Sequence, residues 1–418
     1  MAFMISLPSI SRLALAAALL FPAVSPAFAQ PSELTPEQMS WYRAQMGLAS
    51  ASSSPPVSGN SIGDAVLEWR RLTANSTASF DQLSRFLVAN QGWPDGDKLR
   101  ARAENAISID SFDPARTLAF FNVYPPQTAS GQLRYALALN ASGRRDEGQA
   151  AARRAWTSGT LNEAEVSRVL TIFPAAISPA DHDARMDRLL WSGATTAAAR
   201  QLSLTSPDKR ALFAARLAMR SNAVDAALQA SAVEAANPSL TRTDAGYITD
   251  KATWLRRNGR GGSAQELLAA PRNLTAPPTD TVEWLKTLLV NAQQARSEGN
   301  RQTAYNIASR LDDAVAPDVA LRDASFGIRD NYTSLAWLGA QVAEKDLRRP
   351  ADAARLYRAY SDAAQSAQTR AKGYYWAGRA ALAAGDRAGA DRNFEAAGKY
   401  YDQFYGQLAL ERLGQIGR

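Results

Sequence analysis

The stretch 371–414 constrains the fold of this chain more than any other part of its sequence. In its first half, small and apolar residues such as Tyr375 and Gly378 recur at steps of three and four, which is the spacing of one helix face. Gly385 and Asp386 then interrupt the pattern, because glycine favours a helix C-terminus and aspartate can cap the next helix. The stretch therefore predicts an antiparallel helix pair. One pair cannot bury its apolar stripes alone, so neighbours must pack on it.

The second helix of this pair carries a stripe formed by Ala390, Phe394 and Ala397. If Ala377 and Gly378 occupy positions seven and eight of a repeat of about 34 residues, the three stripe residues fall where a tetratricopeptide-type unit places Ala, Phe and Ala. We therefore expect a tetratricopeptide-like unit at 371–414.

The same alternation of helix and break runs through most of the chain. The apolar spacing predicts single helices at 63–72, 79–90, 95–107 and 114–122. It predicts paired helices on either side of Ser142-Gly143, at 180–191 with 197–204, 209–220 with 223–231, 247–258 with 263–269, 281–298 with 303–311, and 334–345 with 350–364. The predicted fold is all-α: a superhelical array of antiparallel helix hairpins, an α-solenoid that is curved or U-shaped, over residues 61–418.

The first 29 residues have the pattern of a secretory signal peptide. Arg12 precedes an apolar run at 13–21, and the small-x-small triplet Ala27-Phe28-Ala29 follows. A membrane anchor would need about 20 apolar residues, and Pro22 ends this run too early. We expect cleavage after Ala29 and export to the periplasm without a membrane anchor. Residues 30–60 are predicted to be a flexible linker region with a short amphipathic piece around Trp41.

Composition excludes several kinds of chemistry. The chain of 418 residues has no cysteine and one histidine, His182, so thiol catalysis and clusters of histidine ligands for a metal are excluded. The net charge of +7 falls to +6 without Arg12 and favours anionic partners. No nucleic-acid-binding motif accompanies it, so no nucleic acid is expected.

No catalytic, cofactor-binding or metal-binding residue is predicted. The 40 acidic residues lie mostly beside arginine on predicted helix faces, and the sequence has no phosphate-binding loop, dinucleotide fingerprint, HExxH or GxSxG motif. The lone His182 is interpreted as a solvated or capping residue at a helix start. The nine tryptophans are interpreted as hairpin core, with stacking on sugar rings as the alternative.

Six stretches, taken in order, resemble the superhelical (U-shaped) domain of the soluble lytic murein transglycosylases. They are FLVANQGWPDGDKLRARAENAI from Phe86, LRYALALNASGRRDEGQAAARRAW from Leu133, HDARMDRLLWSGATTAAARQL from His182, ATWLRRNGRGGSAQELLAAP from Ala252, NYTSLAWLGAQVAEKDLRRPADAARLY from Asn331, and YYWAGRAALAAGD followed by FYGQLALERLG. In that family this region leads into a lysozyme-like catalytic domain, whose glutamate lies in a Glu-Ser motif. This chain contains no Glu-Ser dipeptide, so no catalytic residue is carried over.

The resemblance implies a peptidoglycan-associated helical scaffold that is non-catalytic in this chain, with glycan strands or cell-wall enzymes as partners. One alternative is a truncated or partial lytic transglycosylase, whose full form cleaves the MurNAc–GlcNAc bond and forms a 1,6-anhydro product. The other alternative is a tetratricopeptide-like adaptor that binds a peptide or protein.

Overall fold

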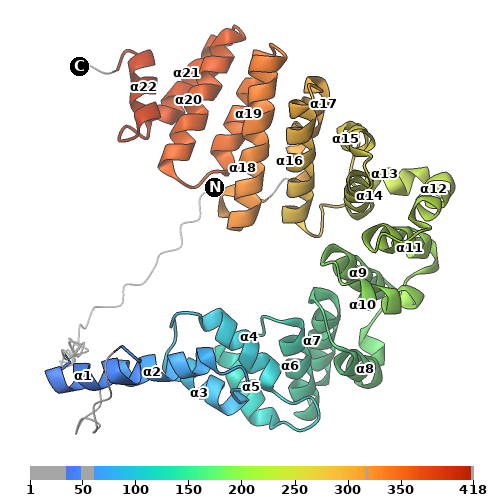
Figure 1. The fold of residues 1–418 in the computed structure, drawn as a ribbon, viewed down its shortest axis with the longest axis vertical. Helices are drawn as coiled ribbons and strands as arrows, with labels where there is room; N and C mark the ends of the chain where they lie inside the picture. The colour runs from blue at the N-terminus through green and yellow to red at the C-terminus, as the bar shows by residue number, and fades with distance from the viewer. Residues whose placement is uncertain (1–33, 49–60, 317–318, 416–418) are drawn as a thin grey trace, which may run out of the picture. The chain divides into compact units, whose positions relative to one another are not determined.

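A computed structural model describes residues 34–48, 61–316 and 319–415. These residues form 22 α-helices and no β-strand (Figure 1), which confirms the predicted all-α fold. The chain divides into two compact units, residues 1–94 and 95–418. The predicted signal peptide at 1–29 lies outside the described residues, as do 30–33 and 49–60 of the predicted linker.

The first unit contains α1 (Pro36–Gln45), α2 (Ser61–Ala74) and α3 (Phe80–Ala89). Helix α1 lies within the segment predicted to be a linker and begins at a capping box, in which Thr35 and Gln38 each bond the other's backbone N–H. Tyr42 is buried and its hydroxyl donates to Asp64 at 2.7 Å. The ring lies so close to Gly63 that a Cβ there would be 2.4 Å from it.

The second unit contains the remaining helices. They are α4 (Gly96–Ala106), α5 (Pro114–Val123), α6 (Ala129–Ala141), α7 (Arg145–Ser158), α8 (Glu163–Ile172), α9 (Pro179–Trp191), α10 (Thr195–Gln201), α11 (Pro207–Arg220), α12 (Ala226–Ala236), α13 (Pro238–Thr243), α14 (Ala245–Arg257), α15 (Gly261–Ala269), α16 (Thr281–Ser297), α17 (Arg301–Ala308), α18 (Phe326–Gln341), α19 (Pro350–Ala363), α20 (Ala367–Ala383), α21 (Arg387–Gly398) and α22 (Phe404–Arg412).

Glycine ends the first helix of five hairpins in the left-handed region that L side chains rarely adopt. The φ values are 79° at Gly143, 72° at Gly193, 73° at Gly259, 85° at Gly299 and 83° at Gly385. All five are breaks predicted from the sequence. Asn222 takes the same role between α11 and α12, with a φ of 51°.

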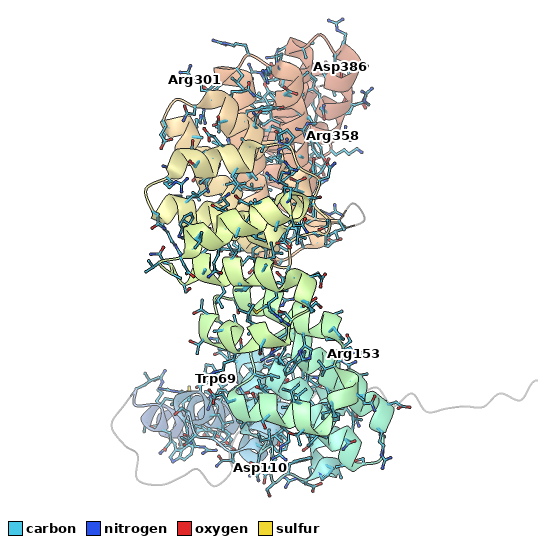
Figure 2. The ribbon with its side chains drawn as sticks, turned by 90° about the vertical axis from the view of Figure 1, so that its right-hand side faces the viewer. Trp69, Asp110, Arg153, Arg301, Arg358 and Asp386 are labelled. Atoms are coloured by element: carbon cyan, nitrogen blue, oxygen red, sulfur yellow. The ribbon has the colours of Figure 1, made fainter. Side chains whose placement is uncertain are left out.

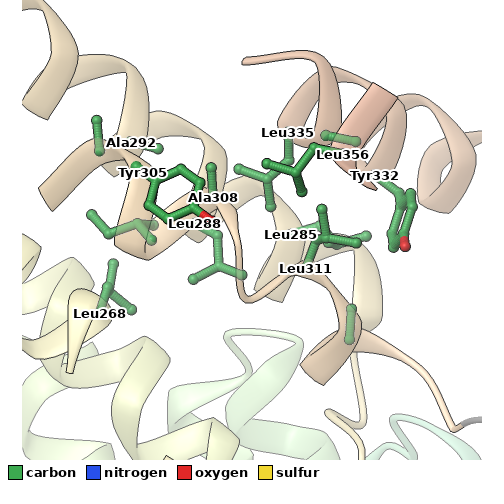
Figure 3. Close-up of a cluster of buried hydrophobic side chains, with 14 of the residues drawn as sticks. Leu268, Leu285, Leu288, Ala292, Tyr305, Ala308, Leu311, Tyr332, Leu335 and Leu356 are labelled. Carbon is green, nitrogen blue, oxygen red and sulfur yellow. The ribbon is translucent and has the colours of Figure 1, made fainter. Parts of the chain in front are cut away.

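A continuous apolar core joins the hairpins from α14 to α20. Figure 3 shows part of it, in which leucines of α15, α16, α18 and α19 surround Tyr305 and Ala308 of α17. Ala292, Ala304, Ala308 and Ala336 have no exposed surface at all. Because alanine occupies little space, it lets the helix axes approach closely.

Three helices were not predicted, and one began earlier than predicted. One of the three is α22, which follows the predicted helix pair within 371–414. The sequence of α8 carries a capping box in which Asn162 and Glu165 bond each other's backbone, and α13 begins with Pro238 at its first position. Helix α18 starts at Phe326 rather than at Ser334 and continues into a π-helical turn, η5 (Val342–Asp346).

Arginine side chains connect successive hairpins of the second unit. Nε of Arg134 on α6 donates to the carbonyl of Ile107, just after α4, at 2.6 Å. Nη1 of Arg185 on α9 donates to the carbonyl of Trp156 in α7 at 3.1 Å. Because the last carbonyls of a helix have no partner within it, these side chains satisfy helix ends that the next hairpin covers.

Candidate functional site

Each carboxyl group buried in the described part of the chain has a hydrogen-bonding partner. Glu104 accepts from the backbone N–H groups of Gln127 and Thr128 at 2.8 and 2.9 Å. Asp183 accepts from the backbone N–H and the hydroxyl of Ser206 at 2.8 and 2.7 Å. Both side chains hold a loop that leads into the next helix, so their role is structural.

The other two buried carboxyl groups form ion pairs. Glu165 receives a hydrogen bond from Nη1 of Arg134 at 2.6 Å. Asp250 lies between Nε of Arg216 at 2.8 Å and Nε of Arg220 at 2.5 Å. A glycosidase acid needs a raised pKa together with access to substrate, and Asp250 has only 1% of its side chain exposed.

Asp64 and Glu68 line a cavity of about 600 Å³ between α2 and α3. Arg71 donates to both oxygens of Glu68, at 2.7 and 2.5 Å. This bond outweighs the effect of burial and lowers the pKa of Glu68, which is opposite to what a proton donor at neutral pH requires. Glu68 therefore does not have the raised pKa of a glycosidase acid.

His182 is half-buried and is not the cap of its helix. Ser178 and Asp181 form the capping box of α9, while the imidazole of His182 meets the indole of Trp156 edge-on with ring centres 5.4 Å apart. Burial lowers the pKa of His182. The prediction that His182 is a solvated or capping residue was therefore wrong, because its imidazole packs against Trp156.

Three of the nine tryptophans are buried, in line with the predicted core role: Trp156, Trp191 and Trp284. Two others meet on the C-terminal helices, where Trp337 of α18 and Trp376 of α20 have ring centres 6.5 Å apart. Spacing along the sequence did not reveal this contact, because the two residues belong to different hairpins.

These two rings belong to a larger group, here called the aromatic strip, made of Trp337, Tyr357, Tyr360, Tyr375, Trp376 and Tyr405. The strip crosses α18, α19, α20 and α22. Tyr357 and Tyr375 are buried, whereas the other four rings are partly exposed. The four partly exposed rings pack against the apolar core and keep part of their surface in contact with solvent.

Two cations accompany the aromatic strip. Nζ of Lys372 lies 3.8 Å from the ring centre of Trp337, and the guanidinium of Arg379 lies 4.7 Å from that of Trp376. Lys372 is partly buried, and this burial lowers its pKa. Within the described residues neither cation has an acidic partner in ion-pair distance, so both charges remain available to an anionic ligand.

The described residues contain neither a metal-binding cluster nor a membrane-spanning helix. No group of three or more His, Asp or Glu side chains is arranged to hold a metal ion. No described helix is both long and apolar enough to cross a membrane.

The chain is similar to solved structures, two of which are described here. No protein-family model and no curated protein matches the chain. These two solved structures are the 70-kDa soluble lytic transglycosylase in complex with bulgecin A and SLT70, the 70-kDa soluble lytic transglycosylase from Escherichia coli. Each is 16% identical with a TM-score of 0.40, over 89% of this chain and 54% of the other. The chain thus spans about half the length of the structures it matches.

Proposed function

We propose that this chain is a non-catalytic helical scaffold of the lytic-transglycosylase type, which binds peptidoglycan in the periplasm. The six sequence stretches that resemble the U-shaped domain of that family support the proposal, as does the array of helix hairpins. The predicted signal peptide supports the periplasmic location.

The observation that carries the binding role is the aromatic strip with Lys372 and Arg379. The exposed parts of these aromatic rings offer apolar surface to sugar rings, and the two cations that lie over Trp337 and Trp376 suit the carboxylates of muramyl and peptide groups. A polymer with alternating sugar rings and carboxylates matches both features.

The pairing of the buried acids supports the non-catalytic part of the proposal. Glu104, Glu165, Asp183 and Asp250 all hold loops or arginines, and the sequence has no Glu-Ser dipeptide. Purified protein incubated with murein sacculi should therefore release no 1,6-anhydro-muropeptides, and clear release would contradict the proposal.

The binding role is tested by sedimentation with purified sacculi. The double substitution Lys372→Gln and Arg379→Gln should reduce the co-sedimented fraction, because it removes both cations from the aromatic strip. Arg358→Gln is the matched control, since Arg358 is exposed on α19 (Figure 2) and pairs with Asp362 at 3.5 Å. Equal sedimentation of all three proteins would refute the assignment of the aromatic strip.

Two exposed rings favour a second candidate, an adaptor that binds another protein. Tyr401, between α21 and α22, and Phe404, the first residue of α22, have 72% and 68% of their surface exposed. A purified cell-wall enzyme that binds the wild type but not Phe404→Ala, together with no sedimentation of the wild type on sacculi, would favour this candidate.

A further inference from the structure

Four arginines are buried in the described residues, and one of them differs from the other three. Arg134 pairs with Glu165, Arg216 with Asp187 and Asp250, and Arg272 with Asp313. No carboxylate of the described residues lies in ion-pair distance of Arg185, although only 2% of this residue is exposed. A buried charge normally requires a partner, because removal from water disfavours the charged form.

The guanidinium of Arg185 is only partly satisfied by the protein. Nη1 donates to the carbonyls of Trp156 and Gly159 at 3.1 and 3.3 Å. The plane of the group lies against the Trp156 indole, 4.3 Å from the ring centre. Nε is buried and donates to no atom of the described residues. Burial lowers the pKa of Arg185 to about 10, so the side chain remains a cation at neutral pH.

Arg185 lines a cavity of about 270 Å³ between α8, α9 and α10. Leu161, Val166, Ala197 and Leu204 form its apolar wall. Gln201 also lines it, and its amide Nε2 contacts Nδ1 of His182 at 3.2 Å. The cavity is close to the lower limit of small-molecule sites, which is about 300 Å³.

The one carboxylate that lines this cavity has its own partner. Glu163 pairs with Nη1 of Arg200 at 2.5 Å, and both side chains are more than half exposed. This exposed pair contributes little net charge, so the buried guanidinium is the dominant charge of the cavity.

We propose that this cavity binds a carboxylate carried on a small apolar body, of the size of a peptide C-terminus. The carboxylate would accept hydrogen bonds from the guanidinium of Arg185, and the apolar body would pack against Leu161, Val166 and Ala197. A fixed guanidinium fork matches a carboxylate geometrically, and the charge-assisted bond is strong in a dry environment. The inference stands independently of the proposed function, because the cavity and the aromatic strip lie on different helices.

The probe is N-acetyl-alanyl-alanine with a free carboxylate, titrated calorimetrically into the full chain. The matched ligand is the same peptide with a C-terminal amide. The free acid should bind at millimolar concentration or tighter and the amide at least about tenfold more weakly, since the charged hydrogen bond is lost. Isobutyrate, a small carboxylic acid without a peptide group, distinguishes the two sources of the ligand. If it binds as tightly as the peptide, the ligand is a free small acid; if it binds more weakly, the ligand is a peptide C-terminus.

Three substitutions complete the test. Arg185→Met should reduce the affinity for the free acid at least about tenfold, and Arg185→Lys should give an intermediate loss. Ala197→Phe should block the cavity while it leaves Arg185 in place. Arg188→Met on the same helix, outside the cavity lining, is the control and should bind normally, and melting curves show that each variant is folded.

Three results would overturn the inference. In the first, the wild type does not bind the free acid at millimolar concentration. In the second, the wild type binds the acid and the amide with equal affinity. In the third, folded Arg185→Met binds the free acid as tightly as the wild type does.

Discussion

Arg216 and Asp250 form a buried ion pair in which Nε of the arginine lies 2.8 Å from Oδ2 of the aspartate. Nη1 of Arg216 also donates to Asp187 of α9 at 2.5 Å, so the guanidinium joins α9, α11 and α14. Burial alone would lower the pKa of Arg216, but the charges of Asp250, Asp187 and Asp244 outweigh it and raise the pKa. The arginine is therefore charged at every accessible pH.

Replacement of Asp250 should strongly destabilise the second unit. Asp250→Ala leaves Arg216 buried with one fewer counter-charge, and breaking such a pair costs about 3–5 kcal/mol. Urea unfolding followed by circular dichroism measures the loss. Asp225→Ala is the control, because Asp225 is exposed and its carboxylate accepts a hydrogen bond from the side-chain amide of Gln229. Similar unfolding midpoints for the two variants would show that the buried pair contributes nothing.

Glu165 should make the stability of the chain depend on acid pH. Burial raises the pKa of Glu165, but the hydrogen bonds from Arg134, Asn162 and Ser130 outweigh it, so the net pKa is lowered from 4.5. Because the folded state then binds fewer protons than the unfolded state, the stabilisation is present above about 4.5 and is lost as the pH falls below that value.

The substitution Glu165→Gln removes this titration. It should lower the free energy of unfolding at pH 7 by about 3 kcal/mol, the lower end for a broken buried pair. It should also reduce the dependence of this free energy on pH between about pH 5 and pH 3, the range in which carboxyl groups with a pKa of about 4 titrate. Urea midpoints at several pH values measure both effects. If the stability of the variant falls with pH as it does in the wild type, the acid dependence comes from other carboxyl groups.

The pKa of His182, the single histidine, should report on the charge of Arg185 in the neighbouring cavity. Burial lowers the pKa of His182, and Arg185 acts in the same direction, whereas Asp181 and Asp183 oppose them. An NMR titration of the imidazole should give a midpoint below the ordinary 6.5, and Arg185→Met should raise it. Because the folded state resists protonation, this residue reduces stability as the pH falls through about 6.5. A midpoint unchanged by Arg185→Met would show that the two groups do not interact.

Two glycines should respond in opposite ways to an added side chain. A Cβ at Gly378 in α20 would lie 2.7 Å from the ring of Phe394, so Gly378→Val should destabilise by about 1–3 kcal/mol through overpacking. A Cβ at Gly262 in α15 meets no atom within 4 Å, so Gly262→Ala should stabilise by about 0.5–1 kcal/mol. Thermal melting distinguishes the two, and equal shifts would contradict the described packing.

Local signals predicted most of the fold. The glycines at 143, 193, 259, 299 and 385 mark hairpin turns, because their positive φ values favour glycine. A single residue type in the sequence was therefore enough to predict each turn. Apolar spacing predicted most of the helices, since each hairpin packs on its neighbours along the chain, but it placed the start of α18 at Ser334 instead of Phe326. Helix α8 was missed altogether, although Asn162 and Glu165 have the spacing of a capping box.

The candidate sites depended on contacts between hairpins, which spacing does not specify. His182 and Arg185 fall on the same helix face as Met186 and Leu189, and this placement of polar residues on an apolar stripe was the available signal. The absence of a carboxylate beside Arg185 could not be inferred, because it depends on how the neighbouring helices pack around α9. The meeting of Trp337 with Trp376 likewise depends on how α18 packs near α20.

Three arginine side chains of the second unit donate hydrogen bonds to carbonyls of earlier hairpins, which bears on the order in which the hairpins assemble. Arg134 reaches back to Ile107, Arg185 to Trp156, and Arg220 to Trp191. In these three bonds the acceptor carbonyl comes earlier in the chain than the donor, whereas Arg100 and Arg153 donate to the later carbonyls of Pro125 and Ala176. When the polypeptide emerges with its N-terminus first, the carbonyls of Ile107, Trp156 and Trp191 therefore stay hydrated until the following hairpin brings its arginine. These three helix ends would then close one after another along the chain.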